Sequence, residues 1–337
     1  MDRKQKRKRW LDNRSKKIQR NKNKKTHSGS GKQEQNNNNY QSKETYIAKA
    51  PEVFSFTENT EETIQYFVDI ITQVKKKIFK QRFYINASDV STITTDALVY
   101  ILAILYNIKH NISMKYEFKG TLPQNENAKK VFMESGFLNY VHTKRIITPT
   151  KADDKIQIIT GKNTNSSVAK NICDFVRSRF NKDYKFTIDL YKTLIELMSN
   201  TVHHAYDEKG LMAPCWYLYA IDKGDSILFA FIDTGNGIPS TVKRKWIEKV
   251  PFAISDAELI YSAFLGESRT ETGMYNRGHG LPALYEKVKS GRLKNFYVLS
   301  GSGSCRSSKS ENGIKFIKEN YKQKIFGTIV KFEIANV

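Results

Sequence analysis

From Val53 to the end of the chain, apolar residues alternate between strand spacing and helical spacing, and this pattern constrains the fold more than any other feature. The predicted strands are residues 53–56, 82–86, 112–118, 155–160, 214–222, 226–232, 294–300, 313–318 and 324–335. The predicted helices are residues 60–79, 96–109, 126–135, 167–180, 187–206, 255–264 and 282–290. Strands that alternate with helices predict a mixed α/β (α+β) architecture.

The first 42 residues lack this pattern. Residues 1–33 hold 14 Lys or Arg and two Asp, which gives this segment a net charge of 14 − 2 = +12. The whole chain of 337 residues has a net charge of +22, so more than half of the excess lies in this segment. A segment with so little apolar surface does not fold alone, so residues 1–42 are predicted to be a disordered basic tail. Residues 1–33 either attract nucleic acid or an anionic membrane surface, or act only as a solubilising tail.

The spacing of the cysteines and the lengths of the apolar runs indicate the cellular compartment of the protein. Cys173, Cys215 and Cys305 form no C-x-x-C pair, which argues against a disulfide framework and a zinc site and favours a reducing cytoplasm. No apolar run approaches the length that spans a bilayer, and no apolar stretch follows the basic N-terminus. We therefore expect a cytoplasmic protein with neither a transmembrane segment nor a signal peptide.

Two polar residues of the predicted helix 187–206 form the first motif that carries chemistry. Glu196 and Asn200 are four residues apart, so they share one face of the helix. An amide oxygen can bind Mg²⁺, and a carboxylate can orient or deprotonate a water molecule. An amphipathic helix can also contain this pair by chance.

The second motif follows the predicted strand 226–232, which runs directly into Asp233-Thr234-Gly235-Asn236-Gly237. Gly235 and Gly237 let the backbone approach a ligand closely. An aspartate at the end of a strand can accept a hydrogen bond from an exocyclic amine, which is what recognition of adenine requires. The alternative is an ordinary glycine-rich turn with aspartate as a turn residue.

Two further motifs lie downstream of a long segment, residues 240–277, for which we expect a functional loop or disorder. Just before the helix predicted from Pro282, the chain reads Arg277-Gly278-His279-Gly280-Leu281. A glycine-rich loop that leads into a helix N-terminus is an anion site, because free amides and the helix dipole face the anion. In the last strand, Gly327-Thr328 places a hydroxyl that can support the contact between Asp233 and adenine.

In order and spacing, these four motifs resemble the GHKL (histidine kinase-like) ATPase family, which includes type II topoisomerase ATPase subunits, MutL, heat-shock chaperones, histidine kinases and anti-sigma kinases. The resemblance covers about residues 163–337 and predicts an ATP-binding domain over residues 146–337. It implies a two-layer α/β sandwich of the Bergerat type with a mixed β-sheet.

The resemblance also implies roles for individual residues in binding ATP and Mg²⁺. Asn200 would bind Mg²⁺, Asp233 the adenine amine, and Glu196 would be the general base if ATP is hydrolysed or transferred. The other residues implied in nucleotide binding are Gly235, Gly237, Arg277, Gly278, His279, Gly280, Leu281 and Thr328. Arg269 is an alternative to Arg277 for the β or γ phosphate, and residues 240–277 would be a lid.

Residues 84–105 and 127–141 resemble a STAS domain, the fold of anti-sigma-factor antagonists, which predicts a STAS-like domain over residues 43–145. The family's phosphorylated serine corresponds here to Asp96, so the resemblance implies that phosphate switching at this position is lost. Asp96 then acts either as a fixed negative charge or as the helix N-cap, and we favour the N-cap. Thr94 or Thr95 is an alternative acceptor.

Taken together, the two resemblances predict an ATP-binding regulatory protein that hydrolyses ATP or uses it to switch the binding of a protein partner. One alternative is a serine/threonine protein kinase similar to the anti-sigma-factor kinases. Another is an ATP switch that associates with nucleic acid through the basic tail. A histidine kinase is disfavoured, because no histidine begins a long helical hairpin. The sequence leaves open whether the protein is an enzyme and whether it forms a homodimer.

Overall fold

The computed structural model describes residues 45–76, 82–111, 116–141, 154–180, 184–204, 212–245, 254–267, 280–311 and 313–335. Contacts group residues 43–337 into one compact unit. The predicted tail, residues 1–42, lies outside the described residues. So do Arg269, Arg277, Gly278 and His279.

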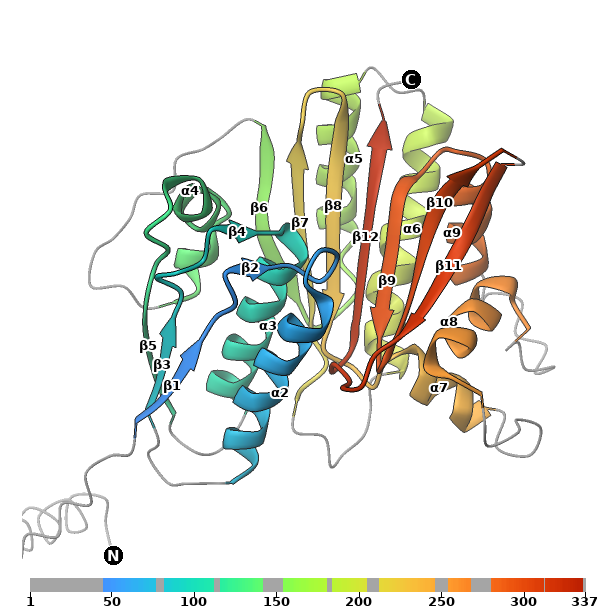
Figure 1. The fold of residues 1–337 in the computed structure, drawn as a ribbon. Coiled ribbons are helices and arrows are strands. Elements are labelled where there is room, and N and C mark those ends of the chain that lie inside the picture. The colour runs from blue at the N-terminus through green and yellow to red at the C-terminus, as the bar shows by residue number, and fades with distance from the viewer. Residues whose placement is uncertain are drawn as a thin grey trace, which may run out of the picture. The chain divides into compact units, whose positions relative to one another are not determined.

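The first part of this unit contains a small parallel sheet and the helices packed on it (Figure 1). Its strands are β1 (Thr45–Lys49), β3 (Arg82–Asn86) and β5 (Glu117–Thr121), in the order β1-β3-β5, and a second parallel pair joins β2 (Val53–Phe54) to β4 (Thr92–Ile93). The helices are α2 (Thr60–Lys75), α3 (Thr95–Asn111), α4 (Glu126–Glu134) and the 3-10 turn η1 (Phe137–Asn139).

The second part is built on a sheet of order β11-β10-β9-β12-β8-β7-β6. Its strands are β6 (Lys155–Gly161), β7 (Trp216–Asp222), β8 (Ser226–Asp233), β9 (Lys294–Ser300), β10 (Gly303–Ser310), β11 (Gly313–Asn320) and β12 (Thr328–Ala335). Its helices are α5 (Ser166–Phe180), α6 (Tyr184–His204), α7 (Ile238–Lys245), α8 (Asp256–Leu265) and α9 (Gly280–Lys289).

Every pairing between these described strands is antiparallel, so the prediction of a mixed sheet is wrong. Short connections account for the pairings β7–β8, β9–β10 and β10–β11, because a tight turn returns the chain in the opposite direction. Between β7 and β8, Gly224 adopts φ 92°, and the amide of Lys223 donates to the carbonyl of Ser226 at 2.8 Å. The predicted hairpin turn at residues 223–225 is therefore confirmed.

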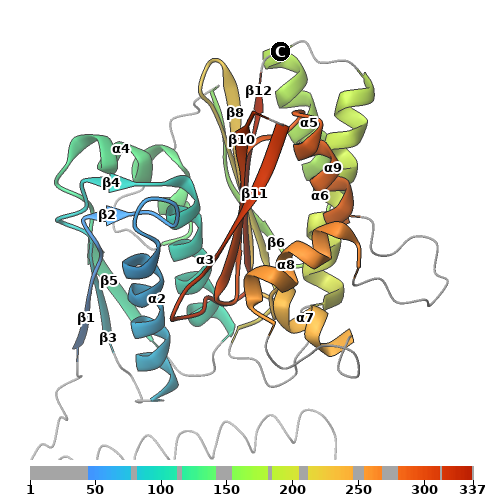
Figure 2. The ribbon, with the colours of Figure 1, turned by 45° about the vertical axis from the view of Figure 1, so that its right-hand side comes forward.

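Both faces of the large sheet are covered by helices, and the helix α3 on one of these faces comes from the first part of the chain. In β8, Phe229 and Phe231 pack in the cluster of α5, α6 and α9, whereas Ala230 and Ile232 pack in the cluster of α3. Side chains alternate between the faces of a strand, so an apolar strand with both faces buried needs a layer on each side. Figure 2 shows α3 between the small sheet and the large one.

The start of α3 corrects one residue-level prediction. The carbonyl of Thr94 accepts the first helical hydrogen bond from the amide of Leu98 at 3.0 Å, so Thr94 occupies the N-cap position and Asp96 does not. Asp96 is fully buried inside the first turn and neither carboxylate oxygen has a hydrogen-bond partner. Its charge faces the ammonium of Lys331 on β12, with 3.6 Å between Nζ and Oδ1.

Candidate functional site

Five strands of the large sheet are level with one another at one end, the lower end in Figure 1. Gly161, Trp216, Asp233, Thr328 and Ser300 are successive Cα partners across β6, β7, β8, β12 and β9. The residue that ends β8 therefore lies beside the residue that begins β12. Two motifs separated by almost 100 residues in the sequence thus meet in one row.

Asp233 is the charged group of this row. Its Oδ1 accepts a hydrogen bond from the amide of Gly235 at 2.8 Å, and the Thr328 side chain also hydrogen-bonds the carboxylate. Burial nevertheless raises the pKa of Asp233 to about 6, because the two hydrogen bonds only partly compensate the lost hydration of the charged form. A carboxylate of this kind is typical of functional sites.

Two glycines let the loops after β8 and before β12 approach each other. Gly327 has φ 75°, and a Cβ atom built there would lie 1.9 Å from the carbonyl oxygen of Asp233. A Cβ atom on Gly237 would lie 2.8 Å from Ser300 Oγ. That hydroxyl joins both loops, because it accepts from the amide of Ile238 and donates to the carbonyl of Gly327, each at 2.9 Å. The glycines are therefore required by close contact as well as by backbone conformation.

The C-terminal half of α6 is held at the same end of the sheet. The amide of Asn165 donates to Met198 Sδ at 3.5 Å, and the indole of Trp216 donates to the backbone of the same loop at 2.9 Å. Met198 lies between Glu196 and Asn200, which are both partly exposed. Among the described residues, neither of these two side chains has a hydrogen bond or an ion pair, so both are available to a ligand.

The second glycine-rich motif is described only from Gly280, where α9 begins. Leu281 packs with Ile238 against a small cluster of Val242, Leu259 and Ala263. The start of α9 is therefore linked to the end of the first glycine motif, which follows Asp233.

The segment predicted as a lid contains two helices. In α8, Ile260 and Phe264 are buried, and Ser255 caps the helix by accepting from the amide of Glu258. An ion pair of 2.8 Å between Lys243 and Asp256 connects α7 to α8. These contacts hold α8 against the sheet. The rest of the predicted lid, residues 246–253 and 268–277, lies outside the described residues.

Sequence reasoning missed the residues that support this site from the opposite face of the sheet. Asn107 on α3 donates to Thr234 Oγ1 at 3.0 Å, directly after Asp233. The hydroxyl of Tyr100, also on α3, donates to the carbonyl of Phe326 at 3.1 Å and accepts from its amide at 3.0 Å, directly before Gly327. The only signal in the sequence was the apolar character of α3 on all sides, which indicates burial but no partner.

No group of three or more His, Cys, Asp or Glu side chains that could hold a metal ion occurs among the described residues. Nor does any helix in those ranges combine the length and apolar character that crossing a bilayer requires. Comparison of the chain with models of known protein families and with curated proteins finds no match.

Proposed function

We propose that the protein is an ATP-binding regulatory protein that binds Mg-ATP at the Asp233 end of the large sheet. The observation that carries this proposal is the meeting of Asp233 and Thr328, a desolvated carboxylate beside a hydroxyl, with glycine-rich loops around them. The carboxylate has no cationic partner among the described residues. Burying such a charge costs stability, which favours a ligand that donates to it, such as the amine of adenine.

Removal of the carboxylate tests the base contact. We expect Asp233→Ala to weaken equilibrium binding of ATP about ten- to a hundredfold, because the adenine amine loses a charged acceptor. Asp225→Ala is the matched control: Asp225 lies in the hairpin before β8, at the opposite end of the same strand. Equal affinities of the two variants would reject adenine binding at Asp233.

Asn200 is the proposed protein ligand of Mg²⁺. One amide oxygen suits an ion that keeps several waters and binds the phosphates of its nucleotide. We expect ATP affinity to rise with added Mg²⁺ in the wild type and to respond much less in Asn200→Ala. A response to Mg²⁺ that is unchanged in the variant would remove Asn200 from the metal site.

Substitution of Glu196 tests whether the protein hydrolyses ATP or uses ATP binding only to switch the binding of a partner. If the protein hydrolyses ATP, a carboxylate four residues from the metal ligand is placed to activate water. Phosphate release that is lost in Glu196→Ala supports an ATPase. Retained ATP binding with no phosphate release in either protein rejects hydrolysis and leaves a switch or a protein kinase. Incubation with labelled ATP and candidate STAS proteins then separates these two.

A further inference from the structure

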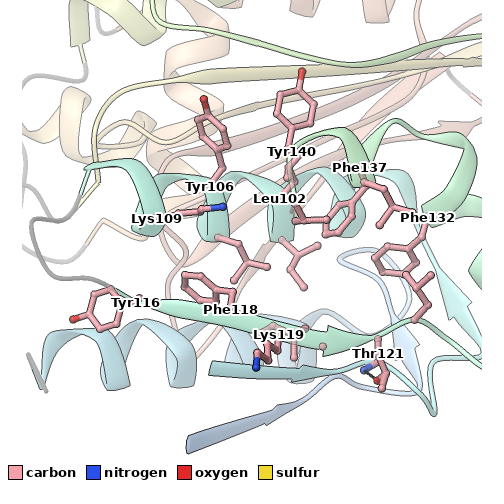
Figure 3. A pocket seen from close by; sticks show the side chains of 18 of the residues that line it. Leu102, Tyr106, Lys109, Tyr116, Phe118, Lys119, Thr121, Phe132, Phe137 and Tyr140 are labelled. Carbon is pink, nitrogen blue, oxygen red and sulfur yellow. Dashed lines mark hydrogen bonds between the residues drawn. The ribbon is translucent and has the colours of Figure 1, made fainter. Parts of the chain in front are cut away.

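A second cavity lies in the first part of the chain, away from Asp233, between α3, β5 and the segment that contains α4 and η1 (Figure 3). Its volume is about 590 Å³, within the range of sites that hold small molecules. Its lining is mainly apolar and includes Leu102, Leu105, Phe118, Phe132 and Phe137. Such a lining selects an apolar body, because it offers little to a polar one.

Most polar groups of the lining are already engaged. Tyr140 donates to the carbonyl of Ile158 at 2.8 Å, and Tyr116 donates to the carbonyl of Val74 at 3.1 Å. Glu117 forms ion pairs with Arg82 and Lys119. These groups are satisfied without a ligand.

Among the charged groups of the lining, the ammonium of Lys109 is the exception. Lys109 lies on α3 at one end of the cavity, beside Tyr106, and the side chain is partly buried (Figure 3). It is the one charged group of the lining that has no ion pair or hydrogen bond among the described residues. An apolar cavity whose one cation without an ion pair among the described residues lies at its end is complementary to a molecule with an apolar body and one anionic head.

We propose that this cavity binds a small amphipathic carboxylate, with its chain among the phenylalanines and its carboxylate at Lys109. The site is spatially separate from the proposed nucleotide site, because it shares no lining residue with the Asp233 row. It uses the apolar face of α3 and the ammonium at the end of that face.

Calorimetric titration of the full chain with decanoate, decan-1-ol and decylamine tests the proposal. We expect saturable binding of decanoate, weaker binding of decan-1-ol and the weakest binding of decylamine. No saturable binding of decanoate would overturn the site, and decylamine binding as tightly as decanoate would overturn the role of Lys109.

Two variants localise the binding. Lys109→Met keeps the apolar stem and removes the charge, so decanoate should bind about tenfold more weakly while decan-1-ol is unaffected. This variant also controls for attraction of decanoate to the other 55 Lys and Arg residues, which it retains. Leu102→Trp should fill the cavity and abolish binding of both ligands. Wild-type affinity for decanoate in Lys109→Met would overturn the proposal even if Leu102→Trp did not fold.

The same helix connects this cavity to the proposed nucleotide site, through Asn107 to Thr234 and through Tyr100 to Phe326. A ligand that shifts α3 would therefore change ATP affinity, and ATP would change decanoate affinity by the same factor, about fivefold or more. This coupling rests on the proposed function, whereas decanoate binding alone does not. Binding of both ligands with unchanged affinities would overturn the coupling and leave the cavity site intact.

Discussion

Burial raises the pKa of the Asp233 carboxyl to about 6, so the proposed acceptor of the adenine amine changes charge not far below neutral pH. The ionised carboxylate is the stronger acceptor of a hydrogen bond from the adenine amine. Protonation of Asp233 therefore competes with nucleotide binding. We expect ATP affinity to be constant above pH 7 and to fall about tenfold per pH unit below about pH 6. Competition binding across this range measures the effect.

The Asp233→Asn variant is the control for that pH profile, because it keeps the shape of the side chain and removes the titration. Its affinity should be lower near neutral pH and nearly flat between pH 5 and 7, apart from titration of the ATP phosphates themselves. A wild-type profile parallel to that of the variant would contradict a role for Asp233 ionisation.

Gly327 is expected to be the least replaceable glycine of the site. Its φ of 75° disfavours any side chain, and a Cβ atom would meet the backbone carbonyl of Asp233. Gly327→Ala should lower the free energy of unfolding by more than about 3 kcal/mol, measured by urea denaturation. Gly224→Ala separates the two causes, because Gly224 also has a positive φ but nothing within 4 Å. It should cost about 1–2 kcal/mol, and equal costs would show that the contact at Gly327 is unimportant.

At the scale of elements, one buried hydroxyl on α3 holds the backbone of Phe326, two residues before β12 begins. Tyr100 satisfies both the amide and the carbonyl of Phe326, so Tyr100→Phe leaves two backbone groups without their partner. We expect a loss of about 1–3 kcal/mol in the free energy of unfolding, measured by chemical denaturation.

Tyr66 on α2 offers a matched control for Tyr100. It is also buried, but its hydroxyl has no hydrogen-bond partner. Tyr66→Phe should therefore be neutral or stabilising, since it removes an unsatisfied polar atom and no bond. If both substitutions cost the same, the hydrogen bonds of Tyr100 would contribute nothing measurable to stability.

Elements with local signals were predicted well, and those without them were missed. The strand β8, its hairpin and the helix α6 follow from apolar spacing and turn residues. The strand β10 has a polar sequence and is held by backbone pairing with β9 and β11, which no local pattern reveals. The helix α7 was missed because Gly237 and Pro239 suggest a loop, although proline suits the first turn of a helix.

Contacts between distant parts of the chain could not be predicted either. The strand β1 was not predicted, because Tyr46, Ile47 and Ala48 form too short an apolar run among polar residues. It lies before Val53, where the predicted pattern starts. The carboxylate of Asp96 was assigned to an N-cap from local preference, whereas its position is set by burial near Lys331 of β12. In the site, the family resemblance alone predicted that Asp233 and Thr328 lie together. Nothing in the sequence predicted the hydrogen bonds from α3 that support them.

At the scale of the whole molecule, the large sheet depends on α3 for the burial of one face. That face carries Tyr217, Tyr219, Ile232, Leu299 and Ile329, all of which are buried in the cluster that includes α3. A fragment of residues 146–337 would expose this apolar surface, so we expect it to aggregate or to lack cooperative unfolding. Size-exclusion chromatography and thermal denaturation measure these properties.

A fragment of residues 43–337 is the control for that truncation, because it retains the whole compact unit. It should unfold in a single transition and bind ATP as the full chain does. A monomeric 146–337 fragment that unfolds cooperatively would show that the proposed ATP-binding part does not need α3.

The central claim, that Asp233 recognises the adenine of Mg-ATP at the end of the large sheet, is tested most directly by titrating the full chain with ATP and with GTP in the presence of Mg²⁺. Guanine presents a carbonyl oxygen where adenine presents the amine, so it would face the Asp233 carboxylate with a second acceptor. We predict saturable one-to-one binding of ATP and at least tenfold weaker binding of GTP, with the difference lost in Asp233→Ala. Equal affinities for ATP and GTP in the wild type, or no binding of either, would contradict the claim.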